Sequence, residues 1–246
     1  MTAIPNCLKH ELQDAQSNYG HLEELAEGAN AIVWYCFQLP AAGDSVGKQS
    51  AASLGRLLLD SSVSVEQALM CTLRGQPRLG WASLRLAAEA LKDLDTIDRL
   101  PDLHPLWLNI GKCTTDEQAR AAMGAFNKLR KQLEPSPVTL VCQACMNISS
   151  RFGSHANATS WQTVGPVSEV SPDSVGLPTR LRDPTTVRFH IRHLMFHGGQ
   201  ILTMLTDFRI KHLQSQQKEL LLAKHAALFA ALQKALPDIG IVELNS

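Results

Sequence analysis

The sequence predicts an all-α protein: a single helical bundle domain with one long loop or small β-hairpin inserted. Hydrophobic residues make up 45% of the 246 residues and charged residues 19%, which is the balance of an ordinary globular core. Aromatic residues are only 5%, so leucine and alanine supply most of the apolar volume. Both are good helix formers, whereas a sheet protein would be richer in β-branched and aromatic residues. Apolar residues also recur at helical spacing, as at Trp81, Leu84, Ala88 and Leu91.

Prolines and a capping signal delimit the helices that we expect in the first half of the chain. These helices cover about residues 6–39, 48–73, 77–100 and 115–133, with Gly20 as a candidate break in the first. Pro40 ends the first helix, and Pro77 suits the first turn of the third because that turn leaves its N–H groups unpaired. Thr114 or Thr115, followed by two acidic residues, is typical of a helix N-terminus. Residues 101–105, with a proline at each end, are expected to form a short connector.

The second half of the chain contains three more predicted helices and one segment of different character. The helices are expected over about residues 138–151, 184–212 and 215–236. Residues 153–184 are instead rich in Gly, Pro, Ser and Thr, which predicts a loop or small hairpin of a length that is often functional. The domain organisation that we expect is an N-terminal helical region over 1–44, packing on a bundle domain over 45–246.

Charge, hydropathy and cysteine content indicate where in the cell the protein is expected and say little about its function. The net charge is zero, so no global field attracts it to nucleic acid, although residues 178–212 hold six basic against two acidic residues. The N-terminus has no signal pattern, and the most apolar run, residues 29–39, is too short to span a bilayer. Six cysteines without an export signal are expected to be reduced, with Cys142 and Cys145 packed into the core. We therefore expect a cytoplasmic protein that does not associate with membranes.

The predicted helix over residues 187–208 carries most of the side chains that could perform chemistry. One apolar stripe along it should face the core. At about 100° per residue, three histidines fall within about 60° of one another beside that stripe: His190, His193 and His197. Arg188 and Arg192 share another side of the helix. Two polar strips should therefore flank one buried stripe.

The string Arg192-His193-Leu194-Met195-Phe196-His197 resembles the motif of the HEPN superfamily, helical domains that include many metal-independent ribonucleases. That motif is an arginine, a polar residue, three further residues and a histidine. The resemblance implies that Arg192 holds the scissile phosphate, that His197 transfers protons and that His193 is the polar motif residue. Arg188 and His193 repeat the arginine–histidine spacing, so Arg188 would bind substrate. Such cleavage needs a group that titrates near neutrality and a fixed cation.

A second resemblance involves residues on two other predicted helices. The run Leu84-Arg85-Leu86-Ala87-Ala88-Glu89-Ala90, followed by Ser149-Ser150-Arg151-Phe152-Gly153-Ser154-His155, is similar to a set of bacterial HEPN-like proteins. Those proteins carry an arginine–glutamate pair on an early helix and a serine–histidine motif at a later helix end. The resemblance implies that Arg151 and His155 bind substrate and that Arg85 and Glu89 support them. It covers roughly residues 45–212 and implies a homodimer of defence or toxin type that cleaves RNA without a cofactor.

Helix geometry sets a condition on the first motif. Positions five apart on an uninterrupted helix are separated by about 140°. Arg192 and His197 could therefore reach one phosphate only with a two-fold partner or with a local irregularity near Gly198 and Gly199.

Two alternatives account for the same residues without RNA cleavage. In the first, the chain is a non-catalytic helical domain that binds a protein or nucleotide, and its histidines and arginines reach solvent or pair with carboxylates. In the second, His190, His193 and His197 hold a metal ion, with His155 or Glu89 as a fourth ligand. The sequence does not decide among the three, so enzymatic activity stays open.

Overall fold

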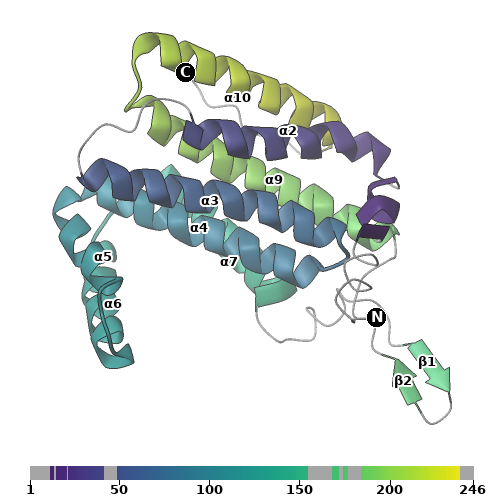
Figure 1. The fold of residues 1–246 in the computed structure, drawn as a ribbon, viewed down its shortest axis with the longest axis horizontal. Coiled ribbons are helices and arrows are strands. Elements are labelled where there is room, and N and C mark those ends of the chain that lie inside the picture. The colour runs from purple at the N-terminus through teal and green to yellow at the C-terminus, as the bar shows by residue number, and fades with distance from the viewer. Residues whose placement is uncertain are drawn as a thin grey trace, which may run out of the picture.

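The computed structural model describes residues 12–13, 15–20, 22–41, 49–154, 168–171, 174–176 and 184–238. In this part of the chain the fold is an all-α bundle, as the sequence predicts (Figure 1). Its helices are α2 (Glu23–Ala41), α3 (Gln49–Leu73), α4 (Pro77–Arg99), α5 (His104–Ile110), α6 (Asp116–Arg130), α7 (Pro137–Ser149), α9 (Pro184–Ile210) and α10 (Ser215–Ala235). A 3₁₀ turn, η1 (Pro101–Leu103), precedes α5, and a π-helical turn, η2 (Ser150–Ser154), follows α7. None of these helices is long and apolar enough to cross a membrane.

Helix α9 is the central element, because it contacts five other helices. It packs against α2 and α10 on one side and against α3, α4 and α7 on the other (Figure 1). The predicted apolar stripe of α9 is buried along its whole length: Val187, Ile191, Leu194, Gly198, Ile201, Leu205 and Phe208. The stripe predicted for α4, including Trp81 and Leu84, is buried too. Burial of these two stripes against each other joins the middle of the chain to its C-terminal third.

Close helix approach depends on small residues at two crossings. A Cβ atom at Gly80 of α4 would lie 2.2 Å from Thr72 Oγ1 and 2.6 Å from the Ala68 carbonyl oxygen, both on α3. A Cβ atom at Gly199 of α9 would lie 2.7 Å from Leu232 Cδ1 on α10. The α3–α4 distance therefore leaves no room for a side chain at Gly80, because one of the two atoms belongs to the backbone, whereas a side chain at Gly199 would require the end of the Leu232 side chain to shift.

Helices α5 and α6 pack on each other and project from the end of the bundle at which α4 ends (Figure 1). Asp93 of α4 anchors both: Trp107 Nε1 donates to Asp93 Oδ2 at 3.1 Å, and Arg130 Nη1 pairs with Asp93 Oδ1 at 2.9 Å. The expected connector over 101–105 is wrong in one respect, since Pro101 begins η1 and Pro105 lies in the first turn of α5. Both prolines lie in a first turn, where a backbone N–H has no helical partner, so their missing N–H groups cost nothing.

Local signals place most helix ends correctly. Pro77 occupies the first turn of α4, and the Thr115 hydroxyl accepts from the Gln118 N–H at 3.3 Å as the N-cap of α6. Helix α2 includes Pro40 and ends at Ala41, two residues beyond the expected end, since a proline in the last turn removes only one helical hydrogen bond. Cys142 and Cys145 are unpaired thiols and fully buried, which confirms their predicted place in the core.

Two short strands lie within the segment predicted as an insertion. β1 (Ser168–Ser171) and β2 (Ser174–Gly176) pair antiparallel (Figure 1). Most of residues 153–184, His155 included, lies outside the described residues. The role expected for His155 in substrate binding therefore stays a prediction.

Candidate functional site

The arginines and histidines of α9 face different neighbours. Arg188 Nε pairs with Glu24 Oε1 of α2 at 2.8 Å, and Arg192 Nη2 pairs with Asp238 Oδ2, beyond the end of α10, at 3.4 Å. His190 Nδ1 accepts a hydrogen bond from Trp81 Nε1 of α4 at 3.0 Å. Because α9 is one α-helix from Pro184 to Ile210, with no irregularity at Gly198 and Gly199, the separation of about 140° between Arg192 and His197 applies. Within one chain the two motif residues lie on different sides of α9.

Burial keeps two of the three α9 histidines uncharged at neutral pH. His190 is 1% exposed and His197 is 8% exposed. Loss of hydration lowers the pKa of each to about 4, although the hydrogen bond between His197 Nδ1 and Gln200 Oε1 acts in the opposite direction on His197. Burial, with the charge of Arg192, also lowers the pKa of the half-buried His193. Neutral imidazoles can accept a proton, but only a small part of the His190 and His197 side chains reaches the surface of the single chain.

Aromatic rings from three elements enclose His190. Phe152 of η2 stacks on Trp81 with ring centroids 5.3 Å apart, and both rings meet the His190 ring edge-on. Phe189 lies between His190 and His193, 4.4 Å from the His193 ring centroid. His190 is therefore a core histidine whose Nδ1 is satisfied by an indole N–H, as expected for a polar group buried without a charge.

Three residues of the second resemblance, Arg85, Glu89 and Ser150, come together, unlike Arg192 and His197. Arg85 Nη1 donates to Ser150 Oγ at 2.7 Å, and Arg85 Nε pairs with Glu89 Oε1 at 2.9 Å. The Arg85 side chain is 30% exposed and that of Glu89 is 48% exposed. Arg151 is exposed, with its guanidinium carbon 5.6 Å from the centroid of the Phe152 ring. The hydrogen bond between Arg85 and Ser150 joins α4 to the π-helical turn η2. Turns of this kind are frequent at functional sites.

Potential metal ligands do not gather at one point among the residues that the structure describes. No group of three or more His, Cys, Asp or Glu side chains in this part of the chain is arranged to share one ion. His190 Nδ1 already accepts from Trp81, and His197 Nδ1 is within hydrogen-bond distance of Gln200. The three α9 histidines therefore do not converge as metal ligands.

A cavity of about 630 Å³ lies at the other end of α9, between α4, α7, α9 and α10. We call it the α9 cavity. Most of its wall is apolar and includes Leu91, Leu94, Val138, Met204, Phe208 and Leu222. The polar side chains on the wall are Asp95, Asp98, Ser136, Asp207, Lys211 and Lys218. Its size and its mainly apolar wall with a few polar groups are those of small-molecule sites.

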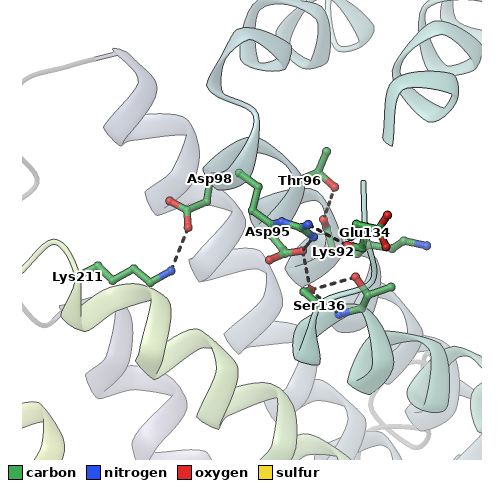
Figure 2. A network of polar contacts seen from close by, with 9 residues as sticks. Lys92, Asp95, Thr96, Asp98, Glu134, Ser136 and Lys211 are labelled. Carbon is green, nitrogen blue, oxygen red and sulfur yellow. Dashed lines mark hydrogen bonds and ion pairs between the residues drawn. The ribbon is translucent and has the colours of Figure 1, made fainter. Parts of the chain in front are cut away.

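Polar contacts fix the helices around the α9 cavity, and Figure 2 shows them. Ser136 caps α7 by accepting from the Thr139 N–H at 3.1 Å, and its hydroxyl donates to Asp95 Oδ2 of α4 at 3.0 Å. Lys211 Nζ, just after α9, pairs with Asp98 Oδ2 of α4 at 3.1 Å (Figure 2). These contacts join α7 and the end of α9 to α4, so the cavity has a preformed wall.

Comparison with known proteins does not identify this site. Comparisons of the chain with protein-family models, with curated proteins and with solved structures gave no significant match.

The sequence-based candidates do not include any residue of the α9 cavity. Met204, Asp207 and Lys211 are spaced three and four apart, so one side of α9 carries them all. Ser136 before Pro137 is also a recognisable start of a helix. Each of these sequence signals is common in helical proteins. Only the packing of α4, α7, α9 and α10 brings the residues that carry them together around a cavity.

Proposed function

We propose that this chain is a non-catalytic helical binding domain and that the α9 cavity is its ligand site. The observation that carries the proposal is the cavity itself, with its volume of about 630 Å³ and its mainly apolar wall. Apolar surface that is already shaped for a ligand can bind it without the cost of ordering flexible side chains.

The arrangement of α9 favours binding over catalysis. Arg192 pairs with Asp238 while His197 lies on another side of the helix and is 8% exposed. A phosphate held by Arg192 would thus be remote from the imidazole that should exchange the proton, whereas general acid–base chemistry needs the two within hydrogen-bond reach.

A tryptophan placed in the cavity tests the proposal. Purified protein is titrated with N-phenyl-1-naphthylamine, a neutral apolar dye whose fluorescence rises on leaving water. The Val138→Trp substitution should weaken dye binding at least about tenfold, because the larger ring occupies the cavity. Leu140→Trp is the matched control, since Leu140 lies on the same helix but is 66% exposed and does not line the cavity. Unchanged dye binding by Val138→Trp protein with a native circular dichroism spectrum would contradict the proposal.

A HEPN-like ribonuclease is the second candidate, favoured by the hydrogen bond between Arg85 and Ser150. That contact joins the early helix to the later helix end, as the second resemblance implies. In this candidate Arg192 of one subunit and His197 of a second subunit act on the same phosphate, because within one chain they lie on different sides of α9. Incubation with labelled RNA in EDTA separates the two candidates, because only the ribonuclease should cleave RNA and lose that activity on His197→Ala substitution. Equal cleavage by both proteins would be background and would remove the second candidate.

A further inference from the structure

Two of the three carboxylates on the wall of the α9 cavity are neutralised by their neighbours. Asp98 pairs with Lys211 at 3.1 Å. Asp95 accepts from Ser136 at 3.0 Å and pairs with Arg99 Nη1 at 3.5 Å. These groups are part of the scaffold, and a ligand would have to displace existing contacts to use them.

Asp207 is the carboxylate that remains. It is half-buried on α9, and no hydrogen bond or ion pair joins it to another of the described side chains. Burial raises the pKa of Asp207, and the nearby charge of Lys211 reduces that shift without cancelling it. Lys211 is already engaged by Asp98, so the Asp207 carboxylate lacks a cation of its own. A partly desolvated carboxylate without a partner is unfavourable, and an ionic or hydrogen-bonding ligand would relieve this.

We infer that the α9 cavity binds an amphipathic amine, with its alkyl or aryl body against the apolar wall and its protonated nitrogen at Asp207. The inference rests on the proposed function, because it names the ligand class of the same cavity. Leu94, Met204 and Leu222 supply apolar contact for the body of the ligand. Among the described side chains, Asp207 is the one carboxylate of the wall without a hydrogen-bond or ion-pair partner, and this favours a cationic group there. Lys218 is the one lysine of the wall without a carboxylate partner among the described residues, so an anionic ligand would meet both Lys218 and the Asp207 carboxylate on the same wall.

Three ligands with the same eight-carbon chain separate charge from apolar burial. Octylammonium, 1-octanol and octanoate are titrated into the protein by isothermal calorimetry at pH 7. Octylammonium should bind about tenfold more tightly than 1-octanol, as expected for one added charge-assisted hydrogen bond, and octanoate should bind most weakly. The preference of octylammonium over 1-octanol is the quantity that tests the role of Asp207.

Substitutions at Asp207 then assign that preference to one side chain. Asp207→Asn should abolish it while leaving the affinity for 1-octanol unchanged, and Asp207→Glu should keep most of it. Asp60→Asn is the control, because Asp60 lies on α3, is paired with Arg56 and does not line the cavity. The Glu variant also distinguishes loss of charge from loss of fold.

The two proposals fail in different ways. If 1-octanol and the dye bind in the cavity but octylammonium has no advantage, the amine inference is wrong and the binding function stands. If the advantage persists in Asp207→Asn protein, Asp207 is not the recognition group and the inference is overturned. If neither dye nor any eight-carbon ligand binds, both proposals fall together.

Discussion

The Trp81 indole N–H donates to His190 Nδ1 across 3.0 Å in the buried contact between α4 and α9. A neutral imidazole that accepts at Nδ1 carries its hydrogen at Nε2. His190 Nε2 is buried and has no hydrogen-bond partner in the described structure. The pair therefore joins two core helices through one polar contact in an otherwise aromatic environment.

Trp81→Phe should destabilise the protein by about 3 kcal/mol, because it leaves His190 Nδ1 unpaired and creates a void beside Phe152. Urea unfolding followed by circular dichroism measures the change. Trp107→Phe is the matched control, because the hydrogen bond that it removes, from Trp107 Nε1 to Asp93, is only partly buried. It should lower the free energy of unfolding by about 1 kcal/mol. Equal losses for the two variants would show that the Trp81–His190 contact has no special weight.

The free energy of unfolding should decrease as the pH falls from about 6.5 to about 4. Burial lowers the pKa of His190 and His197 to about 4, below the value of about 6.5 for an exposed histidine. In this window the unfolded chain binds more protons than the folded chain, so acid favours unfolding, by up to about 3 kcal/mol per histidine.

Urea unfolding at pH 5 and pH 7 checks this dependence. His197→Gln should reduce the difference between the two pH values, because it removes one of the two buried imidazoles of α9 whose pKa is lowered. A difference that is the same in His197→Gln and wild-type protein would exclude His197 as a source of the pH dependence.

The hydrogen bond between Arg85 and Ser150 should contribute measurably to stability. A double-mutant cycle with Arg85→Ala and Ser150→Ala should give a coupling energy of about 1 kcal/mol, because the bond is charge-assisted and partly buried. The cycle of Arg56→Ala and Asp60→Ala is the control, and should give only about 0.3 kcal/mol for an exposed pair within one helix. A coupling at Arg85 no larger than that of the control would mean that η2 is not held by this contact.

Gly80→Ala should destabilise the α3–α4 crossing by about 2 kcal/mol, because its Cβ atom would lie 2.6 Å from a backbone oxygen. Gly55→Ala is the matched control on α3, where the added methyl group would meet no atom within 4 Å apart from the adjoining backbone of its own helix. It should instead stabilise the helix by about 0.5–1 kcal/mol, since alanine has the higher helix propensity. Thermal unfolding of both variants would decide, and a stabilising Gly80→Ala would contradict the close packing of α3 and α4.

Local sequence determined the fold class and most helix ends. Prolines such as Pro77 and Pro137 occupy first turns, and Thr115 caps α6, because these effects involve residues only a few positions apart. The apolar stripe of α9 also followed from spacing alone, since a helix that buries one side needs apolar residues at every turn. The i, i+4 pair of Arg85 and Glu89 is local in the same sense.

Tertiary packing decided which side chains could form a site. Ser150 reaches Arg85 from 65 positions away, and Asp238 reaches Arg192 from 46 positions away. The α9 cavity arises where four helices fail to fill the space between them, and Asp207 lines it because of how α9 is rotated in the bundle. Periodicity indicates that a helix has a buried side. It does not indicate which helix covers that side, because this depends on the shapes of all the packed side chains together.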